Sequence, residues 1–202
     1  MVKIYSKTAR RAASQEMKLG KMICGFVANA MSALDVLAAS FIVLRDGVGD
    51  ATISVAAEQE IPDIRKAFGE DNDVLLAYVV CQKWIATKFL LADGSQVMPV
   101  GTLVTALQGI ENKTFYINGM SPPYSTAKSV RYVVSQKDKK LDSTNLSKVS
   151  WALCHDYPNW TGPVKLTALV QMAHKLGELA GGFLDYGDSI NLHKFTNKIH
   201  FL

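Results

Sequence analysis

The pattern of hydrophobic and polar positions along the chain predicts a mostly helical protein. The stretch from Met22 to Leu44 is apolar, and Asp35 is its only charged residue. Within it, apolar residues recur at spacings of four and three, which is the period of one helix face. The stripe consists of Ile23, Val27, Ala30, Leu34, Leu37, Phe41 and Leu44. We therefore expect a long amphipathic or core helix here, ended by the two glycines of the segment Asp46-Gly47-Val48-Gly49-Asp50.

Other segments also show helical features. The run from Val74 to about Ala92 is apolar on most sides, with Lys83 and Lys88 as its only charges, and predicts the central core helix. Start and stop residues predict shorter helices over 62–68, 99–108, 125–136 and 143–154, and one from Pro163 to Gly181. The β-type run 114–117, followed by Asn118-Gly119, predicts a strand that could pair with residues 52–57.

These elements predict a mainly α fold: a two-lobed helical bundle with a small two-stranded β-ribbon and extended terminal arms. The divisions are a basic arm at 1–21, an N-lobe at 22–136 and a C-lobe at 143–202, separated by the charged run 137–140. The C-terminal tail carries an apolar stripe that must be buried against its own domain or a neighbour. The stripe is the predicted oligomerisation surface: Leu192, Phe195, Ile199 and Leu202.

Composition agrees with a globular protein. The chain has 202 residues, of which 49% are hydrophobic and 20% charged, enough for a sizeable core without disulfides. The three cysteines (Cys24, Cys81 and Cys154) each lie in an apolar run and indicate buried free thiols in a reducing compartment. We therefore expect a cytoplasmic protein or one enclosed within a virion.

Positive charge is concentrated at the N-terminus. Residues 1–21 hold six basic side chains and one acid, whereas the rest of the chain holds 16 basic and 17 acidic side chains. A cationic arm before an apolar stretch is typical of binding to a polyanion or to an anionic membrane. A transmembrane span is disfavoured, because Asp35 would lie near the bilayer centre and the helical stripe would serve no purpose in lipid.

The chain shows no catalytic signature. Cys154-His155-Asp156 are consecutive, and consecutive helical residues point in different directions, so they cannot form a triad. The histidines at 155, 174, 193 and 200 lack the spacing of metal ligands and are interpreted as structural. The segment 46–50 is interpreted as a solvated turn, because it lacks the further oxygen ligands of a calcium loop. We therefore expect no enzyme activity, no cofactor and no metal.

Nucleic acid is the favoured partner. Six cations in 21 residues can neutralise several phosphates, and further cations downstream lie close to aromatic residues that can stack on unpaired bases. The candidate nucleic-acid-binding residues are Lys3, Lys7, Arg10, Arg11, Lys18, Lys21, Arg65, Lys66, Lys128, Arg131 and Tyr132.

Small helical proteins that coat single-stranded genomes combine a two-lobed helical body, a cationic groove and docking arms. By this analogy of architecture, the sequence suggests a non-enzymatic, self-assembling protein of the nucleocapsid or filament-coat type. Its partners would be single-stranded RNA and further copies of itself. Two alternatives stay open: a membrane-associated protein anchored on anionic lipid through residues 1–44, and a structural protein-interaction module.

Overall fold

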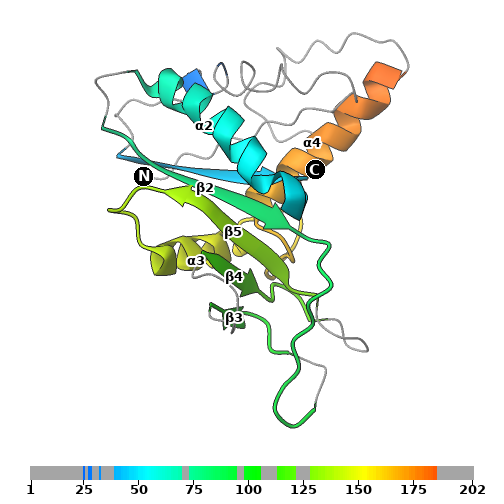
Figure 1. Ribbon diagram of the computed structural model, residues 1–202. Coiled ribbons are helices and arrows are strands. Elements are labelled where there is room, and N and C mark those ends of the chain that lie inside the picture. Colours follow the sequence, from blue (N-terminus) through cyan, green and yellow to red (C-terminus); the bar gives the residue numbers. More distant parts are fainter. Residues whose placement is uncertain are drawn as a thin grey trace.

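The protein is built around a mixed five-stranded sheet with the strand order β1-β2-β5-β4-β3 (Figure 1). The structure, a computed structural model, describes residues 25, 27–28, 32, 39–69, 73–94, 98–105, 113–121 and 128–185. β1 and β2 run parallel, and the remaining neighbours are antiparallel. The strands are β1 (Ser40–Asp46), β2 (Leu75–Gln82), β3 (Leu103–Val104), β4 (Thr114–Ile117) and β5 (Val130–Lys137).

Helices cover both faces of this sheet. Helix α2 (Ile53–Phe68), preceded by the short 3-10 helix η2 (Asp50–Thr52), connects the parallel strands β1 and β2, as a parallel crossover requires. It lies on one face of the sheet, and α3 (Ser143–Ala152) lies on the other (Figure 1). The 3-10 helix η3 (Leu153–His155) follows α3, and α4 (Ala168–Asp185) packs on the same side as α3.

Strand β2 contributes to two hydrophobic cores. Leu76, Tyr78 and Val80 pack with the buried face of α2. The alternate residues Ala77, Val79 and Cys81 join a second cluster that contains Leu146 of α3 and Val170 of α4. Successive side chains of a strand point to opposite faces, so a strand covered on both sides is apolar at nearly every position.

The predicted mainly helical bundle is therefore wrong. The predicted core helix at 74–92 begins with β2, the predicted helix at 125–136 contains most of β5, and the predicted helix at 22–44 ends inside β1. For β2, a short, continuous apolar run was interpreted as helical, although such a run fits a doubly covered strand equally well. The prediction for 125–136 rested on start and stop residues alone.

Two smaller expectations are also wrong, and a third has the wrong starting residue. Residues 53–57 belong to α2 and pair with no strand, and the predicted helix at 99–108 contains the strand β3. Helix α2 begins at Ile53, nine residues before the predicted start, with Pro62 in its interior.

Three expectations are confirmed. Residues 114–117 form a strand, which pairs with β5 and β3. The predicted helix at 143–154 is α3 continued by η3, and the predicted C-terminal helix overlaps α4, which begins at Ala168 and extends to Asp185. Leu146 and Val170 lie beyond the predicted lobe boundary, yet they pack with the sheet that precedes it. Residues on both sides of that boundary thus share one core.

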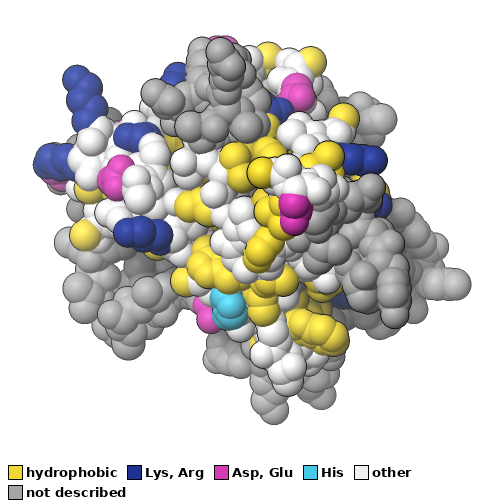
Figure 2. All heavy atoms as spheres, turned by 90° about the horizontal axis from the view of Figure 1, so that it is seen from below, with side chains coloured by type: hydrophobic (Ala, Val, Ile, Leu, Met, Phe, Trp, Pro, Cys, Tyr) yellow, Lys and Arg dark blue, Asp and Glu magenta, His cyan; other side chains and the backbone are white. Residues whose placement is uncertain are grey.

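The surface carries exposed hydrophobic side chains as well as charges. Figure 2 shows hydrophobic side chains gathered over the middle of the face seen from below, with Lys and Arg side chains at separate points around them. Among the described residues, the most exposed large hydrophobic side chain is Trp84, at 86%, followed by Leu90 and Trp160 at 58% each. Among the described residues, no helix has the length and apolar character that a membrane crossing needs.

Candidate active site at the end of strand β1

The glycine-containing loop after β1 holds a carboxylate at the edge of the sheet. Asp46 is the last residue of β1, and its Oδ1 accepts a hydrogen bond from the Gly47 amide at 2.9 Å. Gly47 has φ +78°, a conformation that favours glycine, and the loop then enters η2, where Thr52 Oγ1 donates to the Gly49 carbonyl at 3.0 Å. The Asp46 side chain is 21% exposed, while Gly47, Gly49 and Asp50 are exposed, so most of the loop is solvated as the sequence suggested.

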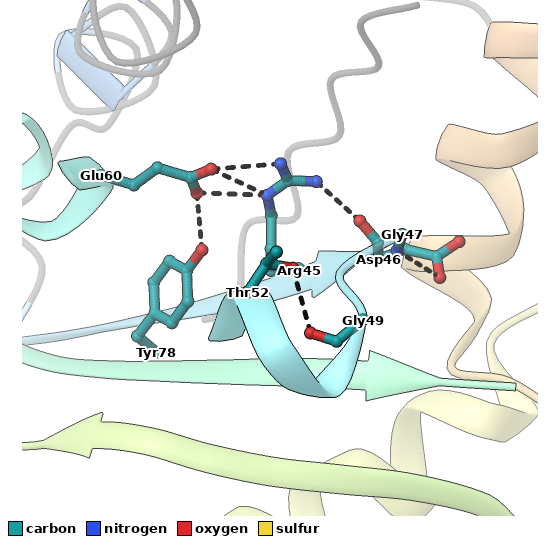
Figure 3. A network of polar contacts seen from close by, with 7 residues as sticks. All are labelled: Arg45, Asp46, Gly47, Gly49, Thr52, Glu60 and Tyr78. Carbon is teal, nitrogen blue, oxygen red and sulfur yellow. Dashed lines mark hydrogen bonds and ion pairs between the residues drawn. The ribbon is translucent and has the colours of Figure 1, made fainter. Parts of the chain in front are cut away.

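A buried polar network fixes the backbone at this carboxylate (Figure 3). Arg45 Nη1 donates to the Asp46 carbonyl at 2.6 Å. Its Nε and Nη2 lie 3.1 Å from the Glu60 carboxylate, which also accepts the Tyr78 hydroxyl at 2.6 Å. Burial would lower the pKa of Arg45, but the hydrogen bond and charge of Glu60 raise it above its ordinary value. Burial and Glu60 both raise the pKa of Tyr78, so Arg45 stays charged and Tyr78 stays neutral.

The far end of the loop is also tied to the sheet. Arg131 Nη1, from β5, donates to Asp50 Oδ1 at 2.7 Å and to Gln82 Oε1 at 3.1 Å. Gln82 in turn donates to the Val48 carbonyl and to Asp50. The loop that carries Asp46 is thus anchored at both ends. Arg45 ties its start to Glu60 of α2 and, through Glu60, to Tyr78 of β2, and Arg131 of β5 and Gln82 of β2 tie its far end.

An imidazole and an ammonium group contact the Asp46 carboxylate. His174 Nδ1, on α4, lies 3.3 Å from Asp46 Oδ2. Lys83, directly after β2, places Nζ 3.5 Å from the same oxygen and 2.9 Å from His174 Nε2. The tautomer with a proton on Nδ1 satisfies both contacts, because Nδ1 then donates to Asp46 while Nε2 accepts from Lys83.

The sheet topology explains why these groups meet. β1 and β2 are parallel neighbours, so Asp46 and Lys83 leave the sheet at the same edge. The carboxyl ends of parallel strands are where ligands bind in open α/β sheets. Asp46 Oδ2 and the His174 Nε2 lone pair converge on one cation, here the Lys83 ammonium group. Three chemical functions are therefore available at this site. The imidazole of His174 can give or accept a proton, the carboxylate of Asp46 can stabilise a positive charge, and the ammonium group of Lys83 can bind a phosphate.

The predicted nucleic-acid-binding residues fall into different environments. Arg65 binds Asp138 and the Val74 carbonyl, and Lys66 contacts Asp63, so both belong to surface ion pairs of α2. Tyr132 is fully buried and stacks on Phe115 with ring centroids 5.0 Å apart, which excludes it from base stacking. Arg131 anchors the loop, while Lys128 is exposed just before β5.

Two groups of predicted residues lie outside the described part of the chain. They are the basic arm (Lys3, Lys7, Arg10, Arg11, Lys18 and Lys21) and the C-terminal stripe (Leu192, Phe195, Ile199 and Leu202). Their proposed roles in binding and oligomerisation stay predictions.

Comparison with known proteins identifies the family. The family model described as the Piwi domain matches residues 1–185 of the 202 residues. The chain belongs to the Piwi family. It is 30% identical over 165 residues to Piwi-like protein 1 of Danio rerio, an alignment covering 79% of this chain and 19% of that protein.

Solved structures share the fold of this Piwi domain. The crystal structure of Drosophila Piwi matches 81% of this chain and 23% of that chain, with a TM-score of 0.69 and 26% identity. A Kluyveromyces polysporus Argonaute structure with a guide RNA matches 88% of this chain and 22% of that chain, with a TM-score of 0.69 and 18% identity. The chain therefore spans about a fifth of the length of these Piwi and Argonaute proteins.

Membership of the Piwi family overturns the functional interpretation of the sequence. The nucleocapsid or filament-coat hypothesis is wrong, because the match is to Piwi proteins and not to capsid, virion or coat proteins. The match to the Piwi family also overturns the expectation that the protein is not an enzyme, which rested on the absence of a catalytic motif in the sequence. The analogy failed because it rested on a helical architecture that the chain does not have.

The sequence interpretation also missed the residues at this site. Asp46 carried a signal: a carboxylate directly after an apolar β-type run and before glycine is typical of a site at the end of a strand. His174 carried none, because a single histidine on an amphipathic helix is usually structural. Among the described residues, no group of three or more His, Cys, Asp or Glu side chains is placed to hold a metal ion.

Proposed function

We propose that this chain is the nuclease-type part of a guide-RNA-binding Piwi protein, and that Asp46 and His174 take part in cleaving an RNA strand. The observation that carries the proposal is the 3.3 Å contact between these two side chains, from β1 and α4. A carboxylate beside an imidazole at the carboxyl edge of a sheet is suited to proton transfer and to charge stabilisation in phosphodiester hydrolysis. The family match and the guide RNA in the related Argonaute structure support RNA as the substrate.

Each residue has a distinct role in this proposal. Once the Lys83 ammonium group turns from His174 Nε2 to a phosphate oxygen of the strand, Nε2 can take a proton from an attacking water and return it to the leaving oxygen. Asp46 holds the imidazole in the tautomer with Nδ1 protonated, and Lys83 can bind a phosphate oxygen of the strand. Arg45 keeps the Asp46 backbone in place through its bond to the carbonyl.

A divalent cation fits this position only in part. The described residues offer it two donors, Asp46 Oδ2 and the His174 Nε2 lone pair, which already converge on the ammonium group of Lys83. Bound there, a cation would supply Lewis-acid activation of water.

The proposal is tested by guided RNA cleavage. The purified protein, supplied with a guide RNA and a magnesium salt, is incubated with an end-labelled complementary RNA. We expect Asp46→Asn and His174→Ala each to slow cleavage at least about 100-fold, with guide binding unchanged. Asp73→Asn, at a side chain that is 93% exposed, and His155→Ala, at an exposed residue, are the matched controls and should cleave normally. Normal cleavage by Asp46→Asn, or none by the wild-type protein, would refute the proposal.

A further inference from the structure

Trp84 is the most exposed large hydrophobic residue of the described chain, with 86% of its surface accessible. It lies two residues after the end of β2 and next to Lys83 of the candidate active site. A ring of this size would stabilise the fold if it were buried, and exposure to water loses that stabilisation. The face of an indole is also a good surface on which another planar group can stack. Trp84 therefore needs an explanation beyond the packing of this domain.

Lysines surround this tryptophan. Lys165 Nζ lies over the ring, 5.9 Å from its centroid, and donates to the Lys83 carbonyl at 3.3 Å. Burial lowers the pKa of Lys165, and the nearby charges of Lys128 and Lys83 lower it further. Both of these ammonium groups are therefore close enough to repel that of Lys165. In the part of the chain that the structure describes, Lys128 and Lys165 form no ion pair with a carboxylate. Lys83 is balanced by Asp46, but the charges of Lys128 and Lys165 have no such partner among the described residues, and this surplus of positive charge favours an anion.

The topology places these residues along one edge of the sheet. Lys83 and Trp84 follow β2, and Lys128 precedes β5, which is antiparallel to β2, so both segments lie at the same end. Lys165 belongs to the segment before α4, the helix that carries His174. The cations and the ring therefore continue outward from Asp46 and His174, and a strand bound at one would extend over the other.

From this arrangement we infer that Trp84 is a stacking platform for an unpaired base of single-stranded RNA, with Lys83, Lys128 and Lys165 contacting the adjoining phosphates. An exposed aromatic ring flanked by cations is the combination by which proteins bind single strands with little sequence preference. Exposed tryptophans also pack in protein–protein interfaces, but the position of Trp84 beside Lys83 of the candidate active site favours RNA over an acidic peptide. The inference rests on the proposed RNA-cleaving function, since it assigns a subsite to the same strand.

Binding of short RNA without cleavage tests the inference. The full chain is titrated with a fluorescently labelled oligouridylate and, separately, with an oligomer of the same length made only of abasic sites. We expect Trp84→Ala to weaken oligouridylate binding about 5- to 100-fold, the loss of one base–aromatic stack. Binding of the abasic oligomer should be unchanged by Trp84→Ala, because no base is present to stack. Trp84→Phe should keep most of the affinity, and Trp160→Ala, at the other exposed tryptophan, should keep all of it.

The outcomes separate this inference from the proposed function. Equal binding by wild type and Trp84→Ala, or an equal loss for the abasic oligomer, would overturn the stacking site. Absence of oligouridylate binding by the wild-type chain would overturn it as well. If Asp46→Asn slows cleavage and Trp84→Ala leaves RNA binding unchanged, the proposed active site is supported and the stacking role of Trp84 is refuted. If Trp84→Ala weakens RNA binding and Asp46→Asn cleaves normally, the stacking role of Trp84 is supported and the proposed active site is refuted.

Discussion

At the scale of single residues, the ionic groups beside the active site have structural consequences that can be measured. Glu60 is almost fully buried, with 5% of its side chain exposed, and it accepts hydrogen bonds from both Arg45 and Tyr78. Its charge is what keeps the guanidinium of Arg45 compensated inside the protein. Removal of one partner of a buried ion pair is costly, because the remaining charge is left without a counter-charge.

We therefore expect Glu60→Gln to lower the free energy of unfolding by about 3 kcal/mol. Glu58→Gln, at an exposed position on the same helix, should change it by less than about 0.5 kcal/mol. Urea denaturation of the two variants provides the measurement. Equal stability of Glu60→Gln and wild type would show that Arg45 finds another partner and that Glu60 does not hold the network together.

Asp138 links stability to pH. Its carboxylate accepts bonds from Arg65 Nη2 at 2.7 and 2.8 Å and from the Leu76 amide at 2.6 Å. The hydrogen bond from Arg65 lowers the pKa of Asp138, against the opposing effect of burial. Its stabilisation is therefore complete above the unfolded pKa of about 3.9 and is lost as the pH falls through the lowered folded pKa.

Asp138→Asn should accordingly destabilise the protein by about 1 to 2 kcal/mol near pH 7, a modest value because the pair is partly exposed. The difference in the free energy of unfolding between the variant and the wild type should become smaller below about pH 4. Thermal unfolding followed across pH 2.5–7 checks this, with Asp156→Asn as an exposed control. A deficit of constant size over the whole range would contradict the role assigned to the charge.

At the scale of elements, the segment before α4 is held against the end of β4 by a close backbone approach. A Cβ atom added at Gly119 would overlap the Val164 carbonyl oxygen and lie 2.9 Å from that of Lys165. Both contacts are with backbone, which cannot rotate away. The absence of a side chain at residue 119 thus sets the position of Lys165 and of the start of α4.

Gly119→Ala should therefore destabilise the protein by about 1 to 3 kcal/mol, the usual cost of overpacking. Gly49→Ala is the control, because a Cβ at Gly49 meets nothing within 4 Å and its φ is −80°. Differential scanning calorimetry should show a lower melting temperature for the first variant alone. Matching melting temperatures would mean that the 164–165 segment moves aside at little cost.

The same scale explains what the sequence could predict. β4 was predictable because its β-type residues end at Asn118-Gly119, and α3 because Asp142 and Ser143 mark its start. β2 was not, because burial on both faces removes the alternation that distinguishes a strand from a helix. For the site, Asp46 had a local signal at the end of β1, but its partner His174 is brought to it only by the packing of α4 on the sheet.

At the scale of the whole molecule, the order in which parts of the sheet open should depend on how many neighbours each strand is paired with. β2 is bonded along most of its length to β1 on one side and to β5 on the other, and six of its eight residues are buried. β3 contributes two residues at the opposite edge and pairs with β4 alone. Because local opening needs the least energy where few bonds and little buried area are lost, β3 should open long before β2.

Hydrogen exchange of the backbone amides would test this order. We expect protection to be highest in β2 and β5, lower in the edge strand β1, and lowest in β3. The edge strand β1 is the internal control, because within the described residues it also has a neighbour on one side only, yet it is paired with β2 at seven positions. If β3 exchanged as slowly as β2, the sheet would unfold as a single unit from both edges. If β1 exchanged as fast as β3, Asp46 would stand on a locally unstable strand, and the anchors supplied by Arg45 and Arg131 would not stabilise it.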